Sequence, residues 1–103
     1  MSAAAPEKRL EWAPRALEAY LSTLRRIAEE DPFTARHFME RVERSLSMIV
    51  SQPGIGTPAI RRGERRYPIP NTGHVVNYRV TRSAVRIRLW YRARQHMVTN
   101  RLL

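Results

Sequence analysis

Two stretches of the chain repeat apolar residues with the period of an α-helix. The first begins at Pro14 and places apolar side chains at i, i+3, i+4 and i+7, with charged residues on its other faces. Asp31 and Pro32 supply an N-cap and a first helical residue for the second stretch, which ends before residues 52–58. The pattern predicts two amphipathic helices that pack as an antiparallel hairpin. Their apolar stripes are Leu17, Tyr20, Leu21, Leu24 and Ile27, and Ala35, Phe38, Val42, Leu46 and Ile49.

Outside these helices, apolar residues alternate with polar ones, as in β-strands. The alternation predicts a short strand at residues 10–12, before the first helix. After residues 52–58, which we expect to form a loop, it predicts a strand around residues 67–69. Further strands are predicted at residues 75–80 and 85–92, and the short connection between these two favours a hairpin.

The last predicted strand has two chemically different faces. Strict alternation places Val85, Ile87, Leu89 and Tyr91 on one face. It places Arg86, Arg88, Trp90 and Arg92 on the other. If the apolar face packs against the helices, the opposite face presents arginines interleaved with an indole.

The predicted order is strand, helix, helix, strand, strand, strand (β-α-α-β-β-β). It indicates an α+β fold in which the helical hairpin packs on a twisted antiparallel sheet and the first strand pairs at a sheet edge. With 103 residues, 43% of them apolar, the chain fits one domain with a modest core. We expect residues 1–9 to be a flexible N-terminal segment, residues 10–95 a single domain and residues 96–103 a C-terminal tail.

Positive charge is concentrated in the second half of the chain. Residues 1–50 carry eight basic groups and eight carboxylates, whereas residues 51–103 carry eleven arginines and one carboxylate, Glu64. Lys8 is the only lysine among the 19 basic residues. Arginine offers a planar fork of donors that suits phosphate and carboxylate. The second half therefore predicts a surface for an anionic partner; the alternative is a solvated charge cluster that keeps the protein soluble.

Composition excludes several classes of site. The absence of cysteine excludes disulfides, thiolate zinc sites and cysteine nucleophiles, and the three histidines are too scattered for a metal cluster. No glycine-rich phosphate loop is present, so we expect neither a metal nor a cofactor. The densest apolar run is far too short to span a bilayer, and we see no signal peptide. We therefore expect a cytoplasmic protein without a membrane partner.

Short segments of the chain match those of a known superfamily in their order. They are Leu10, Glu11 and Trp12; Pro53, Gly54, Ile55 and Gly56; Arg65, Arg66, Tyr67, Pro68 and Ile69; residues 75–80; and Val85, Arg86 and Ile87, running on to Tyr91, Arg92, Ala93 and Arg94. Over residues 10–95 the chain resembles the RelE/ParE superfamily of bacterial toxins from type II toxin–antitoxin systems. It departs from the pattern at Tyr91, where many members have histidine.

The resemblance implies a toxin that arrests bacterial growth and is neutralised by a cognate antitoxin. We expect this antitoxin to be acidic and to cover the arginine-rich sheet and the hairpin with an amphipathic segment. ParE-like members poison DNA gyrase and RelE-like members cut messenger RNA on the ribosome, and the fold alone does not separate these targets. We favour ParE-like action without catalysis by this chain. A RelE-like endonuclease is the alternative, and a non-toxic nucleic-acid-binding accessory domain is a second one.

The candidate site residues lie in the arginine-rich half of the chain. For contact with a target or antitoxin we single out Arg61, Arg62, Arg66, Arg82, Arg86, Arg88, Trp90 and Arg92. Trp90 fits a stacking platform and a partner-facing hydrophobic side chain equally well. The nuclease alternative would act through Arg65, Tyr91 and Arg94, although Tyr91 could instead pack in the core.

Proton transfer is the weak point of the nuclease alternative. Attack by a 2′-hydroxyl needs a proton acceptor, a proton donor and cationic stabilisation of the phosphorus centre. Arginine supplies only the stabilisation, because its pKa lies above about 12. The remaining candidates are Glu64, Tyr67, Tyr91, His74 and His96. Two of them have plainer explanations, since Glu64 can form an ion pair with a neighbouring arginine and His74 can support a turn.

Overall fold

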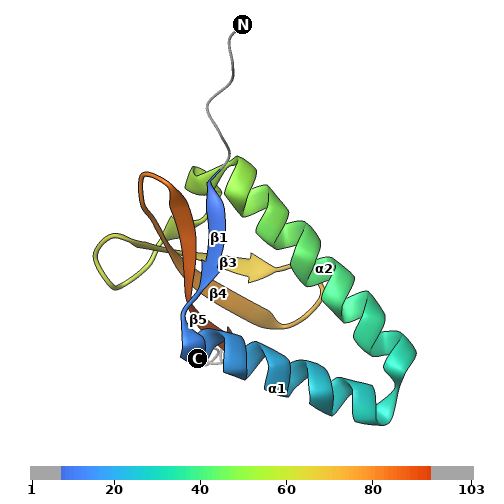
Figure 1. The fold of residues 1–103 in the computed structure, drawn as a ribbon. Helices are drawn as coiled ribbons and strands as arrows, with labels where there is room; N and C mark the ends of the chain where they lie inside the picture. Colours follow the sequence, from blue (N-terminus) through green and yellow to red (C-terminus); the bar gives the residue numbers. More distant parts are fainter. Residues whose placement is uncertain (1–7, 94–103) are drawn as a thin grey trace, which may run out of the picture.

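The computed structural model describes residues 8–93. Helices α1 (Pro14–Glu30) and α2 (Pro32–Ser51) cover one face of a five-stranded sheet (Figure 1). The strands are β1 (Arg9–Trp12), β2 (Thr57–Pro58), β3 (Glu64–Ile69), β4 (His74–Val80) and β5 (Ala84–Arg92), and a short 3₁₀ helix, η1 (Pro53–Ile55), follows α2. The predicted α+β fold is confirmed. Of the predicted terminal segments the structure describes only Lys8 and Arg9, and Arg9 belongs to β1.

Asp31 divides the helical hairpin, as the sequence predicts. Its backbone N–H donates to the carbonyl of Ile27 and closes α1. Its carboxylate caps α2 by accepting hydrogen bonds from the Phe33 N–H (3.1 Å) and the Thr34 hydroxyl (2.7 Å). The Thr34 hydrogen bond, followed by that of Phe33, lowers the pKa of the Asp31 carboxyl because both favour its ionised form. One residue thus ends one helix and begins the next.

The strand order is β1-β5-β4-β3-β2, which places β1 and β2 at the edges. β1 pairs with β5 in parallel, whereas the other three pairs are antiparallel. The sheet is therefore mixed, because the helical hairpin gives the chain a crossover long enough to bring its first strand parallel to its last. β2 lies in the predicted loop. It is too short to show a period, and Pro58, which lacks an N–H, is tolerated at a sheet edge.

The core lies between the helical hairpin and the sheet. Its buried side chains are Ala13, Ala16, Tyr20, Phe38, Val42, Leu46, Ile49, Ile69, Val76, Tyr78, Val85, Ile87 and Trp90. The predicted helical stripes supply most of the helical contribution, although Leu17 and Leu21 remain 37% and 38% exposed. Within residues 8–93, no helix combines the length and the apolar character needed to traverse a membrane.

A β-bulge in β5 changes which side chains face the core. Neighbouring residues of β4 pair with Ile87 and Leu89, so Arg88 between them has no partner. Beyond the bulge the alternation shifts by one residue: Trp90 is buried, whereas Leu89 and Tyr91 are exposed. The strict alternation predicted for this strand is therefore wrong, because a period of two cannot reveal an inserted residue.

Candidate target-binding surface

The sheet face opposite the helices, which we call the outer face, carries most of the charged strand residues. Cross-strand pairing identifies its members, because directly opposite residues point to the same side of a sheet. Its charged and polar members, together with Leu89, are Arg9 and Glu11 in β1; Arg86 and Tyr91 in β5; Asn77 and Arg79 in β4; and Glu64 and Arg66 in β3. Arg88, which is unpaired in the bulge, belongs to the same face because its Nε donates a hydrogen bond to Glu64. The outer face thus combines arginines with two carboxylates.

One row of charged residues crosses the outer face from strand to strand. Glu11 pairs with Arg86, Arg86 with Arg79, and Arg79 with Glu64. Two arginines directly opposite each other repel, and a carboxylate at each end of the row offsets this repulsion. The centre of the predicted arginine surface is therefore partly neutralised by the protein's own acidic residues.

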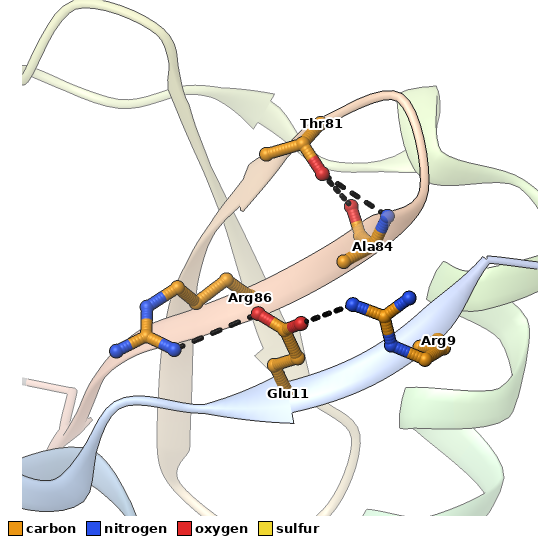
Figure 2. A network of polar contacts seen from close by, with 5 residues as sticks. All are labelled: Arg9, Glu11, Thr81, Ala84 and Arg86. Atoms are coloured by element: carbon orange, nitrogen blue, oxygen red, sulfur yellow. Dashed lines mark hydrogen bonds and ion pairs between the residues drawn. The ribbon is translucent and has the colours of Figure 1, made fainter.

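Glu11 lies between two arginines at the β1 end of the row (Figure 2). One carboxylate oxygen accepts a 2.8 Å hydrogen bond from Arg9, and the other lies 3.6 Å from the Arg86 guanidinium. These side chains are partly exposed, so the pairs orient the arginines more than they stabilise the fold. The start of β5 is fixed by Thr81, whose hydroxyl donates to the Ala84 carbonyl and accepts from the Ala84 N–H (Figure 2).

Glu64 lies at the other end of the row and is buried, with 1% of its side chain exposed. Its Oε2 accepts a 2.9 Å hydrogen bond from Nε of Arg88 and lies 3.8 Å from the Arg79 guanidinium. Its Oε1 is buried without a hydrogen-bond partner in the described part of the chain. The ion pair considered for Glu64 from the sequence is therefore present. Enclosed in this way, the carboxylate braces two arginines and is poorly placed to accept a proton from a substrate.

Besides Arg92, which lies on the helix-covered face, four of the predicted contact residues carry charge that no carboxylate of residues 8–93 offsets within 4.0 Å. They are Arg61, Arg62, Arg66 and Arg82. The first two lie in the exposed β2–β3 connection and Arg82 lies in the β4–β5 turn, while Arg66 is half-buried on the outer face. The accessible positive charge is thus displaced from the centre of the sheet toward its connections.

Arg65 points to the inner, helix-covered face of the sheet. It pairs with Tyr78 and donates a 2.6 Å hydrogen bond to the carbonyl of Gly56. The Tyr78 hydroxyl accepts from the Gly56 N–H (2.9 Å) and donates to the carbonyl of Pro53 (2.7 Å). Burial raises the pKa of the Tyr78 phenol, which keeps the hydroxyl protonated. Arg65 and Tyr78 together therefore fix η1 against the sheet.

Tyr91 points outward near the end of β5 and is 36% exposed. Its hydroxyl donates a 2.9 Å hydrogen bond to Oδ1 of Asn77. Arg65 lies on the opposite face of the sheet, and Arg94 falls outside the described residues. The structure therefore does not bring together Arg65 and Tyr91, two of the three residues that the nuclease alternative requires.

Trp90 belongs to the core and not to the arginine surface. It is 7% exposed, and its indole N–H donates a 3.1 Å hydrogen bond to the Thr23 hydroxyl in α1. Its ring packs against Tyr20, Phe38 and His74. The predicted position of Trp90 beside the outer arginines is wrong because the bulge turns the indole inward, where its N–H needs a protein partner.

His74 and Arg92 lie opposite each other on the inner face. Nδ1 of His74 lies 3.0 Å from the Thr72 carbonyl, and its backbone N–H donates to the Thr72 hydroxyl, so the predicted turn-supporting role is confirmed. Burial is the main cause that lowers the pKa of His74, and the nearby Arg92 also lowers it. Arg92 was expected beside Arg86 and Arg88, but the bulge places it on the other face.

Sequence reasoning missed Arg9, Glu11 and Arg79 as members of the outer face. The alternation of residues along β4 could have placed Arg79 on the outer face. The two β1 residues reach this surface only through parallel pairing with β5, which the order of elements does not reveal. Tyr67 is half-buried, and His96 lies outside the described residues. In residues 8–93 no group of side chains forms a metal site. The outer face can therefore hold anionic groups, but the described chain gives it few proton-transfer groups.

Comparison with known proteins agrees with this architecture. A solved structure described as a chromosomal ParDE toxin–antitoxin system from P. aeruginosa contains a chain that superposes with a TM-score of 0.66 at 18% sequence identity. The match covers 85% of this chain and 98% of that chain. At this identity the likeness concerns the fold. A search of curated proteins gave no match.

Family membership follows from the sequence over nearly its whole length. The model of the family described as the ParE toxin of type II toxin–antitoxin systems, parDE, matches residues 10–96. This range includes both helices, the whole sheet except Arg9, and the arginine-rich outer face. The chain therefore belongs to the ParE toxin family and is the toxin of a type II toxin–antitoxin system.

Proposed function

We propose that this toxin arrests growth by binding DNA gyrase in the cytoplasm and that it does not itself cleave RNA. One observation supports the proposal that the toxin does not cleave RNA. Arg65 and Tyr91 lie on opposite faces of the sheet, and the Arg65 guanidinium donates a hydrogen bond to the Gly56 carbonyl. A nuclease site needs its cationic and proton-transfer groups around one phosphate. A binding surface needs no such convergence.

The other proton-transfer candidates support a non-catalytic role. Glu64 is enclosed beneath two arginines, and His74 lies on the inner face. Lys8, the only lysine, donates to the carbonyls of Thr81 (2.9 Å) and Arg82 (2.8 Å) at the β4–β5 turn. Tyr91, by contrast, has a hydroxyl on the outer face of the sheet. This position of the hydroxyl favours the second candidate function, a RelE-like endonuclease.

Inducing the toxin in bacterial cells separates the two candidates. We expect growth arrest with filamentation and DNA-damage signalling, and primer extension should show intact transcripts. The Tyr91→Phe variant should arrest growth as strongly as the wild type, because the gyrase proposal gives this hydroxyl no chemical role. Cuts within codons that disappear in Tyr91→Phe would instead establish the endonuclease.

The antitoxin is expected to contact two different surfaces. Its carboxylates complement the exposed arginines Arg61, Arg62 and Arg82. Its amphipathic segment fits a groove of about 310 Å³ between β1 and α2, which is lined by the apolar Leu10, Leu46 and Val50 and by the polar Lys8, Glu43 and Ser47. This groove lies beside β1, an edge strand with one free side that a partner segment can use.

A charge placed in the groove tests the antitoxin site. Leu10 is 38% exposed, so Leu10→Glu should leave the fold intact and weaken antitoxin binding at least tenfold by placing a carboxylate where an apolar side chain of the antitoxin has to pack. Phe33→Glu is the matched control, because Phe33 is 67% exposed at the start of α2, away from the groove. Equal antitoxin affinity of both variants, measured by calorimetry, would place the segment elsewhere.

A further inference from the structure

A cavity of about 470 Å³ lies on the inner face, lined by residues of both helices and of the β3–β4 turn. The two helices diverge on either side of this turn (Figure 1). We call this cavity the hairpin pocket. Its side chains include Arg26, Glu30, Phe38, Arg41, His74 and Arg92, contributed by both helices and two strands. Its volume lies in the range of roughly 300–1,000 Å³ that is typical of small-molecule sites. It is separated from the outer face by the full thickness of the sheet.

The hairpin pocket holds positive charge that the protein does not neutralise. Arg26, Arg41 and Arg92 have no carboxylate of residues 8–93 within 4.0 Å, although Glu30 also lines the cavity. By contrast, the central arginines of the outer face share Glu11 and Glu64. Like charges gathered around a cavity repel one another unless an anion enters.

The threonine hydroxyls of the pocket are already engaged. Those of Thr23, Thr34 and Thr72 each donate to a protein oxygen. His74 is 6% exposed, and its Nδ1 is held by the Thr72 carbonyl. The three guanidinium groups and Nε2 of His74 therefore remain for a ligand, since residues 8–93 provide no hydrogen-bond partner for Nε2.

The protonation of the His74 ring further restricts the chemical class of the ligand. A carbonyl can only accept, so Nδ1 carries the proton and Nε2 of the neutral ring is an acceptor. A suitable ligand must offer negative charge to the arginines and an O–H to Nε2. A protein carboxylate lacks that proton, whereas a phosphorylated compound can supply it from its phosphate or from a hydroxyl. We propose that the hairpin pocket binds the phosphate group of a small phosphorylated molecule.

This site is distinct from the outer face, the candidate target-binding surface, because it lies on the other side of the sheet. Binding can be measured on the purified full-length toxin by calorimetry and by the NMR signals of the His74 ring. The probes are inorganic phosphate, adenosine monophosphate and acetate. We expect both phosphate compounds to bind and to shift the His74 signals. If adenosine monophosphate binds more tightly than inorganic phosphate, the natural ligand is larger than the phosphate ion. If the two bind equally, the ligand is the phosphate ion itself.

Matched arginine variants test whether binding occurs in the pocket. Arg41→Gln and Arg92→Gln should each weaken phosphate binding roughly tenfold, the loss expected for a charge-assisted hydrogen bond. Arg61→Gln and Arg82→Gln remove the same charge from exposed connections and should change binding less than twofold. None of these four side chains donates a hydrogen bond within residues 8–93, so all four variants should fold, which circular dichroism can verify.

Three results would overturn the proposal. Equal weakening in all four variants would show attraction by net charge alone. A His74 signal that phosphate leaves unchanged would place any bound anion outside the pocket. Acetate that binds as tightly as phosphate would contradict the assignment of a phosphorylated ligand.

Discussion

Trp90 and Tyr91 are neighbours in the chain but belong to opposite sides of the molecule. The indole of Trp90 is enclosed by core rings and bonded to Thr23, whereas the phenol of Tyr91 lies on the outer face and bonds Asn77. The burial of Trp90 and the exposure of Tyr91 therefore both depend on the β-bulge at Arg88. Without the bulge their environments would be exchanged.

Removing one polar group from each residue tests this placement. Trp90→Phe should lower the free energy of unfolding by about 1–3 kcal/mol, because it leaves a gap in the core and removes the hydrogen bond to Thr23. Tyr91→Phe should change it by less than about 0.5 kcal/mol, as expected for an exposed group. Urea denaturation gives both values. A larger loss for Tyr91→Phe than for Trp90→Phe would contradict the register of β5.

Glu64 and Glu11 occupy equivalent ends of one charged row but differ in burial. Glu64→Gln should lower the free energy of unfolding by about 1–3 kcal/mol, because Arg79 and Arg88 lose the carboxylate that offsets their charge. The same change at the partly exposed Glu11 should cost less than about 1 kcal/mol. Equal effects of the two substitutions in denaturant unfolding would show that Glu64 does not brace these arginines.

His74 should make the toxin less stable in mild acid. Its folded-state pKa is lowered, chiefly by burial, below the value of about 6.5 in the unfolded chain. The unfolded state therefore binds more protons as the pH falls, so stability is greatest above about pH 6.5 and decreases as the pH falls toward the folded-state pKa. His74→Gln should reduce this loss between pH 7.5 and 5.5, measured by urea unfolding. His37→Gln, at an exposed histidine, should retain the wild-type loss.

At the scale of elements, local patterns predicted both helices and the three C-terminal strands. Asp31 fixes the helix boundary through hydrogen bonds from Phe33 and Thr34, and Pro32 suits the first helical position, so residues adjacent in the sequence are enough to predict this boundary. The bulge at Arg88 and the parallel β1–β5 pair depend on contacts between distant segments, so neither appears in a periodicity. The sequence therefore predicted that the candidate site is rich in arginine. It did not predict which face of the sheet Trp90 and Arg92 occupy, because the bulge decides this.

The η1 turn offers a pair of glycines in contrasting surroundings. A Cβ added at Gly56 would lie 2.7 Å from the Arg66 carbonyl oxygen and 2.8 Å from the Tyr78 hydroxyl, whereas at Gly54 it would meet no atom within 4 Å. Gly56→Ala should therefore lower the free energy of unfolding by about 1–3 kcal/mol through overpacking. Gly54→Ala should be neutral or slightly stabilising. Equal stability of the two variants would show that Gly56 is not held against the sheet.

At the scale of the whole molecule, three groups of arginines can be distinguished within residues 8–93, besides those on the exposed surfaces of the helices. The centre of the outer face is balanced by Glu11 and Glu64, while exposed arginines lie in the connections around it and further arginines surround the hairpin pocket. A surface of this kind binds and orients anionic partners through long-range attraction. Within residues 8–93 it does not bring together the acid and base that RNA cleavage requires, and a toxin that acts by binding needs neither.

The most direct test adds the purified toxin to gyrase with plasmid DNA and, separately, to ribosomes translating a defined messenger RNA. The proposed function predicts inhibition of supercoiling with accumulation of cleaved plasmid, reversed by the antitoxin, and an intact messenger RNA. Unaffected gyrase together with messenger RNA cut inside codons would contradict it and would establish a nuclease.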